Sequence, residues 1–302
     1  MSIELAPGNK HRLSLASPLM AGSGALGLAD AWPPGVSAAA FGAIILAPVS
    51  LSPRRGPAGP RLTELPGGFV LATGGQNPGY RRATQEHGRD WRRLGVPVLA
   101  AMDGLDQDGG QNSGDWARLA ELWGESGLVA GLELTLPEEI HARAAREAVN
   151  AVRRATTLPL LAKLPAGQAV VLGEACLQGG ADALVVGVPP RAAYPSTEGP
   201  AGETPGGQAP VSETLGGQRP LVEAPIAGPV AFPFTLSALR RVSALGLGAP
   251  LIAAGGILTL AQLSLCQELG AAAVQVRSLL WTDPLAVTRL AEALASGSAS
   301  QA

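Results

Sequence analysis

Two adjacent carboxylates are the side chains best suited to taking up a proton. Glu138 and Glu139 follow the apolar run 128–134, and a carboxylate placed there can act as a general base. The same residues suit the first turn of a helix predicted from Pro137 to about Arg154, because Pro and acidic side chains are favoured in that turn. Helix capping is the more ordinary interpretation, so the pair does not by itself define an active site.

Histidine and cysteine, the usual metal ligands and nucleophiles, form no pattern of either kind. His11 precedes the first predicted strand, and His87 and His141 are predicted on solvated helix surfaces. Cys176 and Cys266 fall in apolar helical stretches and are expected to be buried, unreactive thiols. We therefore expect neither a metal site nor a disulfide framework.

The composition is that of a globular protein with little net charge. Hydrophobic residues make up 46% of the 302 residues and charged residues 15%, with a formal net charge of -2. No basic run indicates a nucleic-acid surface, and no apolar run is long enough for a signal peptide or a membrane anchor. The expected protein is soluble and cytoplasmic, with no nucleic-acid or membrane partner.

Short apolar runs alternate with longer amphipathic stretches along the chain. The runs lie at 15–21, 43–49, 97–102, 128–134, 158–164, 182–188, 250–254 and 273–276. The clearest amphipathic stretches lie at 116–126, 137–154, 169–179, 235–245, 260–269 and 284–294. Uninterrupted apolar runs are typical of parallel strands covered on both faces. Strand and helix alternating in this way predict one (β/α)₈ TIM barrel over residues 1–302. An open doubly wound sheet is the alternative, because periodicity does not show closure.

Two long segments interrupt this alternation. Residues 52–80, rich in Pro and Gly, separate the second strand from its helix, and a connection of that length is usually functional or disordered. Residues 189–229 follow the sixth strand and contain a short tandem duplication, 203–210 and 213–220. We expect the second segment to be a flexible insertion over the mouth of the barrel.

Four stretches, in order, resemble the class 1 (cytosolic) dihydroorotate dehydrogenases. They are residues 17–24, residues 41–45 with the Pro, Arg, Gly and Asn positions of 53–79, residues 161–165, and residues 250–257 followed by 270–276. The resemblance implies a (β/α)₈ barrel and a flavoprotein oxidoreductase of pyrimidine biosynthesis. In that family dihydroorotate is oxidised to orotate: FMN accepts a hydride, and a Cys or Ser removes a proton.

The resemblance also implies a cradle for FMN at the carboxyl ends of the strands. Gly255 and Gly256 end the seventh strand, where such barrels bind phosphate through backbone N–H groups. Lys163 ends the fifth strand and matches a lysine near the flavin ring. Arg277 stands where the family has the first residue of a Gly-Thr pair, so it could pair with the phosphate or fill its space. The implied cofactor-binding residues are Gly22, Ser23, Gly24, Lys163, Gly228, Gly255, Gly256, Arg277 and Ser278.

A plainer alternative exists for the glycines and for Lys163. The glycines could be turn formers without a ligand. Lys163 could be a solvated residue at the end of its strand.

The family's catalytic pattern is incomplete in this chain. After the fourth strand many members read Glu-Leu-Asn and then Ser-Cys-Pro-Asn, whereas residues 133–139 read Glu-Leu-Thr-Leu-Pro-Glu-Glu. Thr135 replaces the asparagine and is a weak candidate for the base, since a hydroxyl needs an activating partner. A lysine that contacts flavin in the family is absent from 46–50, and Asn77 is the one substrate-binding asparagine that remains.

Three functions remain open. The chain could be a divergent FMN oxidoreductase acting on a small molecule, a non-catalytic barrel that binds or regulates a partner, or a dihydroorotate dehydrogenase with an unrecognised base. Relatives of this kind include homodimers and complexes with an iron–sulfur flavoprotein subunit. Two cysteines cannot hold a cluster of their own, so an iron–sulfur partner would be a separate chain.

Overall fold

The computed structural model describes residues 2–56, 61–103, 113–195 and 221–296, and it contains a closed barrel of parallel strands. The strands are β3 (Leu19–Ala21), β4 (Ala43–Ile45), β7 (Val98–Asp103), β8 (Gly131–Thr135), β9 (Leu160–Pro165), β10 (Ala183–Val188), β13 (Leu251–Ala254) and β14 (Ala271–Val276). Their order around the ring is β10-β13-β14-β3-β4-β7-β8-β9, and β9 closes onto β10. The predicted TIM barrel is confirmed, and the open sheet is excluded.

Both faces of these strands are buried, which explains their uninterrupted apolar sequences. On β8, Leu132 and Leu134 pack outward against the helix layer. Residues such as Met20, Ile45 and Leu161 pack together in a second cluster inside the ring. Only 4% of the residues are aromatic, and the interior of the barrel is filled with aliphatic side chains.

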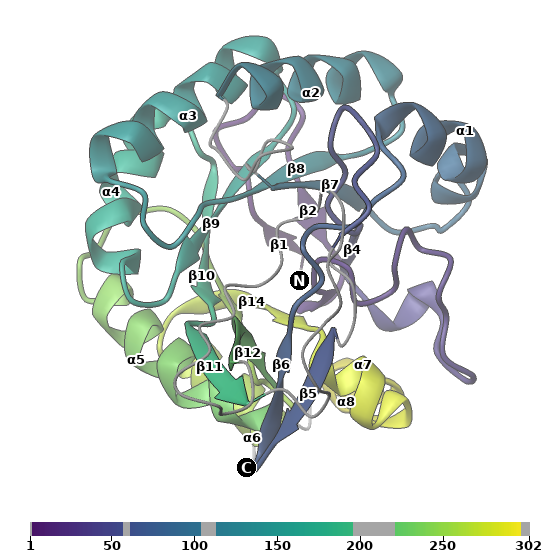
Figure 1. Cartoon of the computed structure of the whole chain (residues 1–302), viewed down its shortest axis with the longest axis vertical. Helices are drawn as coiled ribbons and strands as arrows, with labels where there is room; N and C mark the ends of the chain where they lie inside the picture. Colours follow the sequence, from purple (N-terminus) through teal and green to yellow (C-terminus); the bar gives the residue numbers. More distant parts are fainter. Residues whose placement is uncertain (1, 57–60, 104–112, 196–220, 297–302) are drawn as a thin grey trace.

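A layer of helices surrounds the barrel (Figure 1). The helices are α1 (Tyr80–Trp91), α2 (Ser113–Ser126), α3 (Ala142–Ala155), α4 (Ala169–Gly179), α5 (Phe232–Ser243), α6 (Leu260–Glu268), α7 (Ser278–Thr282) and α8 (Pro284–Ala295), with 3₁₀ turns η1 (Ala38–Ala40) and η2 (Pro229–Ala231). In the part of the chain that the structure describes, no helix is long and apolar enough to cross a membrane.

One helix begins later than the sequence predicts. Helix α3 starts at Ala142 with His141 as its N-cap, so Pro137 lies outside it and His141 is at its end rather than on its surface. The buried face of α3 is formed by Ala145, Ala148, Val149 and Val152. Their spacing of three, one and three residues follows the roughly 3.6-residue turn of an α-helix.

The two long segments meet in a small sheet outside the barrel. Strands β5 (Leu62–Leu65) and β6 (Gly68–Leu71) form a hairpin, and β11 (Arg191–Pro195) and β12 (Leu221–Ala227) form another. β12 pairs with β6, giving the antiparallel order β11-β12-β6-β5, and Figure 1 shows this sheet beside α7. The prediction of a flexible loop is therefore wrong for 191–195 and 221–227, because β11 pairs with β12 and the end of β12 pairs with β6 of the earlier segment. The tandem duplication lies outside the described residues.

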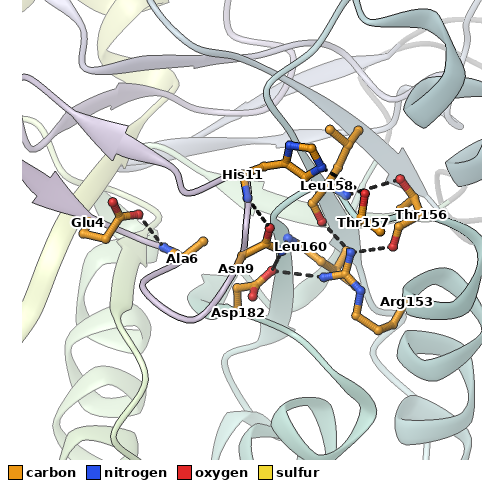
Figure 2. A network of polar contacts seen from close by, with 10 residues as sticks. All are labelled: Glu4, Ala6, Asn9, His11, Arg153, Thr156, Thr157, Leu158, Leu160 and Asp182. Carbon is orange, nitrogen blue, oxygen red and sulfur yellow. Dashed lines mark hydrogen bonds and ion pairs between the residues drawn. The ribbon is translucent and has the colours of Figure 1, made fainter.

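The amino end of the barrel is closed by the start of the chain. Strands β1 (Ile3–Glu4) and β2 (Ser14–Leu15) form a hairpin whose Leu5, Leu13 and Leu15 pack with the barrel interior. Figure 2 shows the polar contacts there: Asp182 accepts hydrogen bonds from Asn9 at 3.2 Å and from the backbone of Leu160 at 2.8 Å. The hairpin thus seals the end at which the strands begin.

Candidate active site at the carboxyl end of the barrel

A buried polar cluster crosses the inside of the barrel. The ammonium of Lys163, on β9, donates to Oε1 of Glu133 at 3.0 Å and to Oε1 of Gln275 at 2.7 Å. The amide of Gln275 in turn donates to Oε2 of Glu133. Glu133 lies on β8 and Gln275 on β14, half-way round the ring from each other, so the cluster spans the bore. We call Glu133, Lys163 and Gln275 the barrel triad.

The triad is buried, so the two charged side chains must stabilise each other. The Glu133 side chain is 0% exposed and that of Lys163 is 13% exposed. A carboxylate without contact with water needs a cation and hydrogen-bond donors, and Lys163 and Gln275 supply them. The alternative that Lys163 is a solvated strand end is therefore wrong.

Glu133 and Gln275 were not identified as site residues from the sequence. Each is a lone polar side chain in an otherwise apolar strand, in Gly131–Thr135 and Ala271–Val276. The sequence therefore indicates that each of these side chains needs a polar partner, because both faces of the strand are buried. It does not indicate which residue the partner is, since Gln275 lies 112 residues from Lys163.

Arg277 lies directly after β14. Its guanidinium carbon is 4.9 Å from the centre of the Trp281 ring, a cation–π contact. Among the described residues no acceptor forms a hydrogen bond or ion pair with this guanidinium. The side chain is exposed, yet the surrounding protein desolvates it and lowers the pKa of Arg277 to about 10, which leaves it cationic at neutral pH. Arg277 is thus a solvent-accessible cation close to other protein atoms, and its N–H groups donate to no acceptor among the described residues.

Trp281 joins the Arg277 region to the small sheet. Its indole N–H donates to the backbone oxygen of Ala25 at 3.2 Å, and its ring centre lies 5.9 Å from that of Phe69 on β6. Trp281 is 41% exposed despite these contacts. Trp281 therefore fixes one face of the Arg277 guanidinium and leaves the rest of it open.

The loop after β3 lies beside Arg277. The backbone N–H of Gly22 donates to Val276 at 2.8 Å, and a Cβ at Gly22 would lie 3.6 Å from the Cβ of Arg277. The hydroxyl of Ser23, which is buried, donates to the backbone oxygen of Leu46 at 3.3 Å. Gly24 has a φ of 71°, which favours glycine, while Ser278 is buried as the first residue of α7.

The later glycines are needed for packing within the protein itself. A Cβ at Gly256 would lie 2.3 Å from the backbone nitrogen of Phe232, and one at Gly228 would lie 2.9 Å from the Cα of Gly68. Gly255 would meet the Thr235 hydroxyl at 2.6 Å. Close backbone packing is sufficient to account for all three glycines, and a phosphate-binding role for them stays a prediction.

The chain is similar to known proteins over nearly its whole length. The chain is 29% identical over 306 residues to the dihydroorotate dehydrogenase B (NAD(+)) catalytic subunit of Geotalea uraniireducens, covering 97% of this chain and 92% of the relative. The protein of the same description from Geobacter sulfurreducens is 29% identical, with 96% and 90% covered. Over nearly its whole length the chain is therefore similar to catalytic subunits of dihydroorotate dehydrogenase B.

A solved structure agrees with this assignment at the level of the fold. DHODH from Eimeria tenella, in complex with ferulenol, superimposes with a TM-score of 0.70 at 17% sequence identity, covering 96% of this chain and 82% of that one. No family model matches the chain.

Asn77, the asparagine that the resemblance links to substrate, is largely committed to its own loop. Its side-chain oxygen accepts from the backbone and the hydroxyl of Ser50, at 3.1 and 3.0 Å, and from the backbone of Gly79 at 2.9 Å. Its amide donates to the backbone oxygen of Gly75 at 2.7 Å. Since a side-chain amide has two N–H groups, one donor remains for a ligand.

The candidates for a proton acceptor lie after β8, where the family carries its Cys or Ser. Thr135 is half-buried and pairs in register with Lys163 of the triad. Glu138 and Glu139 are exposed in the turn before α3. The prediction that these carboxylates cap a helix is wrong, because α3 starts at Ala142. Their place in a loop at the carboxyl end of the barrel leaves the role of general base untested.

The remaining reactive side chains stay outside the site. Burial raises the pKa of Cys176 to about 12 and that of Cys266 to about 11, so both thiols are unreactive, as the sequence predicts. Within the described ranges no group of three or more His, Cys, Asp or Glu side chains is arranged to hold a metal ion.

Proposed function

We propose that this chain is an FMN-dependent oxidoreductase that binds its flavin at the carboxyl end of the barrel. The observation that carries the proposal is the barrel triad: a buried carboxylate and amide hold the ammonium of Lys163 inside the ring of strands. A fixed cation beside a flavin ring favours the negative charge of the reduced form.

The residues around the triad fit the phosphate of FMN. Arg277 is exposed and forms no hydrogen bond within the described part of the chain, so it can bind a phosphate in a bidentate manner. Gly22, Ser23 and Gly24 form the adjacent loop, where backbone can approach a ligand closely. When bound, FMN would supply the two-electron acceptor. The protein would supply the charge of Lys163, the donors of Arg277 and the exclusion of water by the small sheet.

The substrate proposed is a small anionic molecule of the dihydroorotate class. Relatives named as dihydroorotate dehydrogenase B catalytic subunits support this class. The remaining N–H of Asn77 would donate to the substrate. Thr135 is the candidate for proton removal closest in register to Lys163, and Glu138 and Glu139 are the candidates with sufficient basicity.

The proposed electron partner is a separate iron–sulfur flavoprotein chain, because the relatives are named as catalytic subunits of an NAD(+)-linked enzyme. A homodimer is the other assembly expected in this family. Co-purification and the mass of the assembly in solution test both proposals.

A non-catalytic barrel is the second candidate function. It is favoured by the absence of Cys or Ser from residues 133–139 and by the internal hydrogen bonds of Asn77. Such a protein would keep the triad for the stability of the barrel alone.

The visible absorption spectrum of the purified protein separates the two candidates. Flavin bands that co-purify, or that shift on addition of FMN, and that bleach with an anaerobic reductant are the result expected for the oxidoreductase. A colourless protein whose added FMN passes freely through a desalting column would refute it and leave the non-catalytic barrel.

A further inference from the structure

We propose that Glu133 and Gln275 are positioning residues that hold Lys163 as a fixed, partly neutralised charge and thereby set the reduction potential of the flavin. The inference deepens the proposed function and rests on it. It concerns the partners of Lys163, which the sequence did not identify.

The hydrogen bonds of the triad define one arrangement. An ammonium has three donors, and two of those of Lys163 are used by Glu133 and Gln275, leaving one. The Gln275 amide accepts from Lys163 through its oxygen and donates to Glu133 through its nitrogen. The reversed amide would place N–H groups against an ammonium and an oxygen against a carboxylate. Each member of the triad is therefore oriented by the other two.

The triad is also held by its backbone. Its side chains come from β8, β9 and β14, and the first two strands are paired directly. Groups on barrel strands are more rigid than groups on loops, so Lys163 is held without help from a ligand. Its remaining donor is the one free to act at the carboxyl end.

The charge of Glu133 reduces the effect of Lys163. The two charged atoms are 3.0 Å apart and largely buried, so the carboxylate offsets much of the positive field that a bound flavin would experience. Removing the carboxylate alone should make the flavin easier to reduce, whereas removing the ammonium alone should make it harder to reduce. A general loosening of the site would not shift the potential in opposite directions.

The first arm of the test needs no flavin. The sequence contains two lysines, Lys163 and the exposed Lys10, so a protein labelled with ¹⁵N-lysine has an internal reference. We expect the Lys163 ammonium protons to exchange with water at least about tenfold more slowly than those of Lys10, because hydrogen bonds in a buried site slow exchange. Glu133→Gln and Gln275→Met should remove most of that protection. Equal exchange at the two lysines in the wild type would overturn the proposal.

Asp182→Asn is the matched control. It makes the same carboxylate-to-amide change in the Arg153–Asp182 ion pair, whose atoms are 3.2 Å apart at the opposite end of the barrel. It should leave Lys163 exchange unchanged. If Glu133→Gln does not fold, Gln275→Met decides the first arm, because it keeps the ion pair and removes one acceptor.

The second arm measures the potential of bound FMN by equilibration with a reference dye. Glu133→Gln should raise it, Lys163→Met should lower it, Gln275→Met should shift it less than either, and Asp182→Asn should leave it unchanged. Unchanged potentials in the first three variants, or a common direction in the two charge variants, would overturn the proposal. A wild-type chain that binds no FMN refutes the proposed function and the control of potential together, while the exchange arm still decides whether the triad holds Lys163.

Discussion

The two ends of the barrel use polar side chains differently. At the amino end, Arg153 donates to Asp182 at 3.2 Å and to the backbone oxygens of Thr156 and Leu158 at 2.6 and 2.7 Å. Figure 2 shows that these polar groups bond to one another and, through Asp182 and Asn9, to the N-terminal segment. At the carboxyl end, counting the described residues alone, Lys163 and Asn77 each retain one donor, and the Arg277 guanidinium retains all of its donors. Polar groups that pair among themselves stabilise a fold, whereas groups with donors left over can bind a ligand.

The first way to test this contrast is Lys163→Met. It leaves the fully buried Glu133 without a cation, and we expect a loss of about 3–5 kcal/mol in the free energy of unfolding. Denaturant titration measures the loss. The double variant Lys163→Met with Glu133→Gln should recover a large part of it, because no unpaired charge remains. A single variant as stable as the wild type would contradict the burial of this pair.

The second test is Arg277→Leu, which should weaken FMN binding by a factor of about 10–100. A hydrogen-bonded ion contributes about 1.5–3 kcal/mol, and Arg277 has no other described partner to account for it. Fluorescence titration with FMN measures the affinity. Arg143→Leu removes an exposed cation from the outer face of α3 and should leave the affinity unchanged. Equal effects of the two substitutions would show that Arg277 acts through net charge alone.

The third test is Asp182→Asn, which should lower stability by about 1–2 kcal/mol and leave FMN affinity unaltered. The amide oxygen still accepts hydrogen bonds, but the charge that attracts Arg153 is lost. Thermal unfolding and FMN titration on the same sample compare the two effects. A weakened FMN affinity in the folded variant would mean that the two ends are coupled.

The smallest expected effect is that of Trp281→Leu. The ring contacts the Arg277 guanidinium at 4.9 Å, and a cation–π contact of this kind contributes about 0.5–1 kcal/mol, so FMN affinity should fall by a factor of about 2–5. Titration of Trp281→Leu in the Arg277→Leu background should show no further loss. An additional loss there would indicate that Trp281 contacts the flavin itself.

The sequence predicted much of the scaffold and part of the site. All eight apolar runs are barrel strands, and helices cover the predicted stretches, because both patterns arise from neighbours within a few residues. The resemblance to the family singled out Lys163 and Arg277, and the structure brings Arg277 beside Gly22. Where local signals competed, the prediction was wrong: Pro137 and two acidic residues are typical of a helix start, yet α3 begins at Ala142.

What the sequence by itself determined was the alternation of strand and helix and the resemblance to one family. What only the tertiary structure decided was which distant residues meet. Barrel closure places Gln275 against Lys163, and the pairing of β12 with β6 converts the ends of two apparent loops into one sheet. The physical reason is that a polar side chain in an apolar strand requires a partner, but its sequence does not encode which one. Strand order and register around the ring make that choice.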